Sequence, residues 1–462
     1  MPSAFAGPEF VNEDFSGSGN WWLPDMPEHS VAGNLDYVHG EKFTLTVIGN
    51  LSSFASFNDG PVTIYGSFQG KQITLFSCFQ TQSSLSWATY GHAQETYTCY
   101  GAFIGIHTVE GLNYEINNIT YRTIRTPSLL NGPQFSFVRN DVEIGMTLKV
   151  PIYQEIEIQS QAKLKLQCLA QFQTGNFSKR ISLDLPWTIE TTENISIQKM
   201  FDKYVNPLVL LSTMTNNAED YLTGVEARSS TEPTQSFKIY NFTFSKNLDI
   251  ERIRPHEQFF NLTNYEIFPD IVNNWLALYD SERDAFNQFF ANRYHSSPLG
   301  EDGFLRIVRA VENWEDGKSS FSKEVVNPEF SRLLKRLRET FSIDEIDVLG
   351  GVPTGRDILL SKITSFSSNL PGPLDHVVSS WPDFIVRTKD TRNAITHSVP
   401  KRNAFKGVEL ALATNLLELI FKVKVMLKLG IPDESIERFL KHSQDLLTIS
   451  RNLETPLGFG SN

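Results

Sequence analysis

Short segments that alternate between apolar and polar residues fill the chain from about residue 33 to residue 189, with turn residues between them. Alternation with a period of two is typical of strands that are buried on one face. Gly70 lies in the turn between two of these segments, which predicts a hairpin. The clearest segments are 43–48, 62–66, 72–76, 155–158, 163–166 and 181–185. Many short strands with glycine and asparagine turns favour a sandwich or barrel-like fold.

Apolar residues recur at helical spacing in two other parts of the chain. A helix is expected over 196–215, with Ser196 as its N-cap and Pro207 kinking or dividing it. Strand-like residues return at 236–242, and from about residue 268 the chain is helical. The later predicted helices cover 273–294, 304–314, 329–341, 356–368, 381–397, 405–429 and 434–450. Several consecutive helices of this kind are most simply packed as a bundle.

These patterns predict an α+β multidomain protein. The β-rich N-terminal domain is expected over 1–245, a connecting segment over 246–272, and an all-α helical domain over 273–462. A chain of 462 residues is long enough for two or three domains. Its 40% hydrophobic and 12% aromatic content indicates that these domains have sizeable cores.

Charge is distributed unevenly along the chain. From Glu301 onward there are 22 Lys and Arg residues against 22 Asp and Glu, so the net charge of −12 lies entirely in the first 300 residues. An acidic surface binds polyanions poorly. If the protein binds nucleic acid, we therefore expect the C-terminal half to make the contact.

The cysteines and the apolar segments exclude several classes of protein. Cys78, Cys99 and Cys168 are far apart and lack the spacing of a zinc site, so we expect buried thiols and no metal. No secretory signal pattern and no apolar segment of about 18 residues is present. The sequence therefore predicts a cytoplasmic protein without a membrane span.

Arg392 and His397 are the strongest candidates for chemistry, and Asn393 directly follows the arginine. RNA cleavage without a metal needs a group that moves a proton at the 2′-OH or at the leaving 5′-oxygen, and histidine titrates in the right range. It also needs a fixed positive charge on the phosphate, which the planar donor fork of arginine provides. Asn393 is expected either to orient the imidazole or to contact the phosphate.

We expect these three residues on one helix, with Ser380 as its N-cap and Pro400 preventing its continuation. Asn393 and His397 are four residues apart and share a face. Arg392 and His397 are about 140° apart on a straight helix. The two residues therefore do not share a face of the helix, but the arginine side chain is long enough to bring its guanidinium round to the imidazole.

Arg-x4-His with a polar residue after the arginine resembles the signature of HEPN-domain ribonucleases. The resemblance implies a HEPN helical bundle and a metal-independent endoribonuclease without a cofactor, with Arg392, Asn393 and His397 as catalytic residues. HEPN domains often place an acidic residue on an earlier helix, facing the arginine. Glu312 is the candidate, and it either pairs with Arg392 or lies on the surface.

The resemblance also implies a homodimer or higher homo-oligomer, because two copies of the motif face each other across a two-fold axis in HEPN ribonucleases. Helix 405–429 carries apolar residues around more than one stripe. These residues serve either such an interface or the core of the helix's own bundle. Arg387, Lys401 and Arg402 are further candidates for contacts with RNA, whether tRNA, rRNA or mRNA.

The front of the chain carries a second resemblance, to the N-terminal domain of the ApeA family of bacterial anti-phage proteins. The segments that carry it are 19–24 (Gly-Asn-Trp-Trp-Leu-Pro), 31–35, 64–67 and 73–76. It implies abortive infection as the outcome and a phage-derived trigger. Trp21 and Trp22 are interpreted either as packing residues or as an aromatic platform for a phage-derived or nucleotide ligand. The alternative to an enzyme is a non-catalytic HEPN-type dimerisation or adaptor module with a ligand-sensing β domain.

Overall fold

The computed structural model describes residues 14–38, 41–51, 60–84, 94–125, 134–139, 144–149, 154–167, 169–174, 179–229, 235–241, 258, 267–294, 300–314 and 355–453. Contacts divide the chain into two compact units. The first comprises Met1–Ile253 and Asn261–Asn273, and the second Arg254–Phe260 and Asn274–Asn462.

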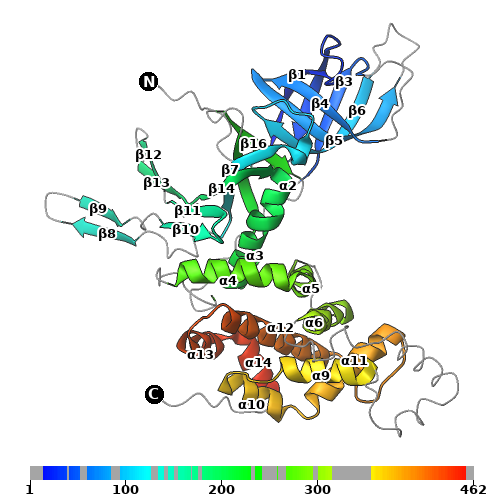
Figure 1. Cartoon of the computed structure of the whole chain (residues 1–462), viewed down its shortest axis with the longest axis vertical. Coiled ribbons are helices and arrows are strands. Elements are labelled where there is room, and N and C mark those ends of the chain that lie inside the picture. The colour runs from blue at the N-terminus through cyan, green and yellow to red at the C-terminus, as the bar shows by residue number, and fades with distance from the viewer. Residues whose placement is uncertain are drawn as a thin grey trace. The chain divides into compact units, whose positions relative to one another are not determined.

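Six antiparallel strands of the first unit close into a barrel (Figure 1). Around the barrel, β1 pairs with β2 and β4, β3 pairs with β2 and β6, and β5 pairs with β4 and β6. The strands are β1 (Phe15–Trp22), β2 (Val31–Tyr37), β3 (Phe43–Ile48), β4 (Val62–Phe68), β5 (Lys71–Ser84) and β6 (Gln94–Ile104). The hairpin predicted around Gly70 is confirmed as β4 and β5. Closure settles the choice between sandwich and barrel, because it leaves no free strand edge among the six.

A second set of strands continues the sheet from β6. In spatial order they are β16 (Ser236–Asn241), β15 (Leu222–Ser229), β7 (Glu115–Thr123), β14 (Trp187–Ser196), β11 (Ala162–Leu166) and β10 (Gln154–Ile158). Two separate hairpins are formed by β8 (Gln134–Arg139) with β9 (Ile144–Lys149) and by β12 (Leu169–Thr174) with β13 (Lys179–Asp184). A short 3₁₀ helix covers Gly111–Asn113.

Trp21 packs against two glycines, Gly33 and Gly66, in the barrel segments that carry the family resemblance. The indole is fully buried, and its Nε1 donates to the carbonyl oxygen of Gly33 at 3.2 Å. A Cβ atom at Gly66 would lie 2.3 Å from the Trp21 ring, so no larger residue fits there. The packing interpretation of Trp21 is therefore confirmed, and a surface platform at this residue is excluded. Trp22 is half-buried and meets the ring of His107 edge-on, with the ring centroids 5.4 Å apart.

The helix predicted over 196–215 is present but divided. Ser196 caps it, since its hydroxyl accepts from the backbone N–H of Lys199 at 3.2 Å. A π-helical turn, Phe201–Val205, separates α2 (Ile197–Met200) from α3 (Asn206–Asn216). Pro207 lies at the start of α3, where its missing N–H interrupts the ladder of hydrogen bonds.

The helices after residue 267 build the bundle of the second unit (Figure 1). The first residues of α4 belong to the first unit, and the helix continues into the second. The helices are α4 (Phe268–Ser281), α5 (Arg283–Arg293), α6 (Glu301–Asn313), α9 (Gly355–Phe366), α10 (Gly372–Ser380), α11 (Phe384–His397), α12 (Val408–Lys428), α13 (Asp433–His442) and α14 (Gln444–Asn452). The helix predicted over 329–341 lies outside the described residues.

Two segments that were each predicted as one helix form two helices in the structure. The prediction of one helix over 273–294 was wrong, because the chain breaks at Glu282 between α4 and α5. The break brings Phe286 back against Trp275, with the ring centroids 4.9 Å apart, whereas eleven residues of straight helix would separate them by about 16 Å. Ser443 likewise divides the helix predicted over 434–450, and its hydroxyl caps α14.

Ser380 is not the N-cap of the helix that carries the motif, and this prediction was wrong. Ser380 ends α10, and α11 begins at Phe384 after Asp383, whose φ is 54°. Trp381 is extended because the residue before a proline is disfavoured in the helical region. The end was predicted correctly: α11 stops at His397, three residues before Pro400.

Aromatic rings from several helices form the core of the bundle. The ring of Phe421 on α12 stacks on Phe289 at 4.5 Å between centroids, and its centroid lies 5.1 Å from that of Trp314. The apolar residues around α12 are already buried within one copy of the chain: Leu410, Leu416, Leu417, Ile420, Phe421, Val423 and Met426. They therefore belong to the helix's own bundle, and they give no evidence for a dimer interface.

Among the helices that the structure describes, none has the length and apolar character needed to cross a membrane.

Limited proteolysis is expected to cut the native chain first between about Ser245 and Asn273. The strand pattern of the sequence gives way to a helical pattern there, and the boundaries between the two compact units fall in the same interval. Mass spectrometry of the early fragments should give one product that ends and one that begins in this interval. Early cuts found only between residues 300 and 400 would contradict the predicted boundary at 246–272.

Candidate active site

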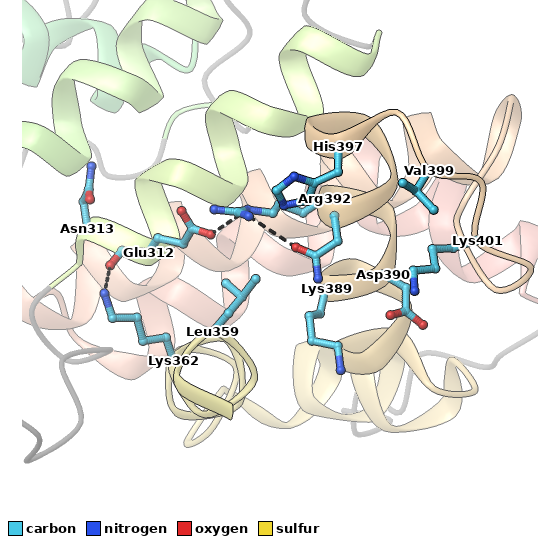
Figure 2. Close-up of a pocket in the computed structure, with 11 residues that line it drawn as sticks. Glu312, Asn313, Leu359, Lys362, Lys389, Asp390, Arg392, His397, Val399 and Lys401 are labelled. Carbon is cyan, nitrogen blue, oxygen red and sulfur yellow. Dashed lines mark hydrogen bonds and ion pairs between the residues drawn. The ribbon is translucent and has the colours of Figure 1, made fainter. Parts of the chain in front are cut away.

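A pocket of about 750 Å³ lies where the end of α6, the middle of α9 and the second half of α11 meet (Figure 2). Its walls come from four parts of the helical unit. They are Glu312 and Asn313 of α6, Leu359 and Lys362 of α9, Lys389, Asp390, Arg392, Asn393 and His397 of α11, and Val399 and Lys401 of the segment after α11. All three residues of the predicted motif therefore line one cavity.

The guanidinium of Arg392 is held by two neighbours. Its Nε lies 3.0 Å from Oε1 of Glu312, and its Nη1 donates to Oδ1 of Asn393 at 3.2 Å. Figure 2 shows the guanidinium extending from α11 toward α6, with its contact to Glu312 drawn as a dashed line. The side chains of Arg392 and Glu312 keep 27% and 18% of their exposure, so the cation is fixed but accessible from the pocket.

Glu312 pairs with Arg392, which is the first of the two arrangements considered from the sequence. The carboxylate lies in the last turn of α6, next to the backbone carbonyl that accepts a hydrogen bond from Nζ of Lys362. This second contact ties α9 to the end of α6. Glu312 thus contributes to the pocket wall opposite α11 in two ways: its side chain binds Arg392 and its backbone binds Lys362.

His397 is the last residue of α11, and its side chain is exposed. The helix stops there because Ser398 adopts a left-handed conformation with φ of 53°. Figure 2 shows the imidazole on the same side of α11 as the Arg392 guanidinium. The long arginine side chain thus places a cation and an imidazole on one pocket although they are five residues apart.

Comparison with models of known families gives two matches that lie in the same order as the two parts of the chain. Residues 17–275, more than half of the chain, match ApeA N-terminal domain 1. Residues 301–435 match the Apea-like HEPN family. This chain belongs to the ApeA family and carries a C-terminal HEPN domain. No curated protein and no solved structure matches it.

The HEPN match of this ApeA-like chain includes every part of the pocket. The helices α6, α9 and α11 and the segment up to Lys401 all fall within residues 301–435. Membership of the ApeA family, together with the HEPN domain, supports a general role as a HEPN nuclease-like protein in anti-phage defence. The β-rich front domain and the helical rear domain predicted from the sequence are confirmed by the two matches and by the fold.

The three candidate RNA contacts lie in different environments in the ApeA-like HEPN domain. Lys401 lines the pocket, whereas Arg387 and Arg402 do not. The guanidinium of Arg387 pairs with Glu409 at 2.7 Å, donates to the carbonyl oxygen of Asn403 at 3.1 Å, and stacks over the Phe405 ring. Arg387 thus joins α11 to the start of α12, while Arg402 is exposed.

Sequence reasoning missed several residues that line the pocket. Lys389 has a clear signal, since it lies four residues before Asn393 and eight before His397 on the same helix. Asp390 is seven residues before His397, which is also a same-face spacing. Lys362 and Leu359 come from α9, and no local pattern marks them as neighbours of the motif.

Of the cysteines in the described residues, neither Cys78 nor Cys99 lines this pocket. Cys78 and Cys99 are buried, as predicted, and face each other across β5 and β6, where burial and the neighbouring thiol raise the pKa of Cys78. Cys168 lies outside the described residues. In the described part of the chain, no group of three or more His, Cys, Asp or Glu side chains is arranged to hold a metal ion.

Proposed function

We propose that this ApeA-like chain is a metal-independent endoribonuclease of the HEPN type that acts in bacterial anti-phage defence by abortive infection. The observation that carries the proposal is the shared pocket of Arg392, Asn393 and His397, with Arg392 held by Glu312. Its substrate is RNA, and the trigger is a phage-derived signal acting on the chain. The working form is a homodimer or a higher homo-oligomer.

The roles of the residues follow from their contacts. In the proposed reaction the 2′-oxygen attacks the phosphorus, the bond to the 5′-oxygen breaks, and a proton moves from the 2′-OH to a base while an acid protonates the leaving oxygen. His397 is the proton-transfer group, since its exposed imidazole reaches the pocket. Arg392 neutralises the phosphate, and the charge that develops there is stabilised by a cation already fixed in place.

The hydrogen bond of Asn393 favours one of its two predicted roles, the contact with the phosphate. Its Oδ1 accepts from Arg392, so the amide group that remains for other contacts is the NH₂ donor. A donor suits a phosphate oxygen next to the guanidinium. We therefore assign Asn393 to positioning Arg392 and contacting the phosphate, rather than to orienting His397.

The proposal predicts that cleavage of RNA by the purified chain is unchanged in EDTA. Neither proposed step uses a metal ion, and attack by the 2′-OH leaves 2′,3′-cyclic phosphate or 3′-phosphate ends together with 5′-OH ends. Denaturing gels of bulk tRNA and rRNA, followed by end analysis of the fragments, test both expectations. Activity that vanishes in EDTA and returns with Mg²⁺ or Mn²⁺ would contradict the mechanism. A chain that binds RNA but cleaves none would favour the non-catalytic adaptor.

A further inference from the structure

Lys389 lies one helical turn before the motif and next to both of its leading residues. It is three residues before Arg392 and four before Asn393, and these are the spacings at which side chains on a helix are neighbours. The rise of about 1.5 Å per residue places its Cα roughly 4.5 to 6 Å before theirs along the axis.

The ammonium of Lys389 is positioned for an anion from outside the chain. Lys389 is half-buried in the pocket wall, and among the described residues none forms a hydrogen bond or ion pair with its Nζ. Arg387, two residues earlier, contrasts with it, because its guanidinium is held by Glu409, by a backbone carbonyl and by the Phe405 ring. Of these two cations of α11, Arg387 thus supports the fold, while Lys389 faces the cavity.

The pocket face of α11 has a cationic edge and an edge that carries a carboxylate. Lys389 and Arg392 lie three residues apart on the first edge. Asp390 and His397 are seven residues apart, about 20° round the helix, and form the second. A polyanion that places one phosphate on Arg392 is therefore attracted along the Lys389 edge and repelled by Asp390 on the other.

The pocket is also larger than one phosphodiester needs. Its volume of about 750 Å³ lies in the upper part of the range of pockets that enclose whole small ligands. We propose that Lys389 binds the phosphate next to the scissile one, so that the pocket holds a single-stranded RNA segment with at least two phosphates. This inference rests on the proposed function, since it takes Arg392 and His397 as the place of cleavage.

The test is a thermodynamic cycle of binding affinities, in which Lys389→Met is combined with neutralisation of the phosphate next to the scissile one. The ligands are 2′-O-methyl oligonucleotides, which cannot be cleaved, with either an ordinary phosphate or an uncharged methylphosphonate on one side of the central linkage. Lys389→Met should weaken binding of the fully charged strand about tenfold, as expected for one charged contact. Lys389→Met should have no effect on binding of the strand in which the phosphate that Lys389 contacts is replaced by the methylphosphonate. The side of the central linkage on which this replacement removes the effect shows the direction of the strand in the pocket.

Salt dependence gives a second measurement. Losing one phosphate contact to a single strand should reduce the slope of log affinity against log salt by about 0.7. Lys389→Arg should keep both the affinity and the slope. Lys441→Met, which removes an exposed lysine of α13 outside the pocket, is the matched control and should leave both unchanged.

The outcomes separate this inference from the proposed function. If the wild-type chain cleaves RNA but Lys389→Met binds every strand as the wild type does, the second phosphate site is wrong and the proposed function stands. If the cycle shows the coupling but the wild-type chain cleaves no RNA, the binding site stands and the nuclease does not. A wild-type chain that binds none of the strands overturns the phosphate site.

Discussion

Replacing His397 by alanine should reduce RNA cleavage by roughly 10²–10⁴-fold, the range expected for loss of a general acid or base. The free energy of unfolding should stay close to that of the wild type, because the imidazole is exposed and ends its helix. Initial rates on a defined RNA measure the first quantity, and chemical denaturation measures the second. His376→Ala is the matched control, since His376 is an exposed histidine of α10 outside the pocket.

Arg392→Ala should cause a loss of similar size, and Arg392→Lys tests its cause. Lysine keeps the charge but lacks the planar fork that meets Glu312 and Asn393, so it should restore only a small part of the activity. Arg438→Ala, at an exposed arginine of α13, should cleave at the wild-type rate. If either His397→Ala or Arg392→Ala also cleaves at the wild-type rate, the site is assigned to the wrong residues.

Glu312→Gln separates positioning from charge in the same assay. Glutamine retains an oxygen that can accept from Nε of Arg392 but gives up the ion pair. We therefore expect a smaller loss of activity than for Arg392→Ala. The free energy of unfolding should fall by about 1 kcal/mol or less, because the ion pair is partly exposed. A loss as large as that of His397→Ala would mean that Glu312 itself takes part in proton transfer.

The features predicted well from the sequence depend on local chemistry. Alternation gave the β4–β5 hairpin, Ser196 caps its helix, and α11 ends at His397 before Pro400. The arginine–histidine spacing also placed both residues on one helix. Each of these depends on neighbours within a few residues, which is the range over which periodicity, caps and prolines act.

The features that were missed depend on contacts between distant segments. The break at Glu282 lets Phe286 return onto Trp275, and the start of α11 follows a turn in which Trp381 packs on Phe405. The choice between an interface and a bundle core for the apolar residues of α12, which the sequence left open, likewise depends on the assembled bundle, since α6, α13 and α14 all pack on this helix. The pocket residues from α9 become neighbours of the motif only after the helices pack.

Cleavage should require at least a homodimer, because the described residues of one pocket offer a single imidazole and a single fixed guanidinium for the reaction. In-line displacement needs a base on one side of the phosphorus and an acid on the other. A two-fold contact doubles the groups of one chain, and HEPN domains often dimerise. His397 is exposed, as are Val399 and Val408 in the segments after it, so this region is open to a second copy.

Sedimentation velocity should therefore find the active chain as a dimer or larger assembly. Activity per chain should fall steeply when the protein is diluted into the range where monomers prevail. Adding back an inactive His397→Ala chain at high concentration should not restore full activity, because it completes the assembly without a second imidazole. A monomer that cleaves RNA at the full rate per chain would refute the requirement.

Proximity of the two motifs can be tested without any activity. In a Cys168→Ser background, whose described cysteines Cys78 and Cys99 are buried, His397→Cys should be cross-linked between copies by a short bifunctional maleimide. Lys441→Cys on α13 also presents an exposed thiol, but one outside the pocket, and it should not be cross-linked. If the copies instead join only through Lys441→Cys, they assemble by another face, and each pocket must complete the reaction with its own Arg392 and His397.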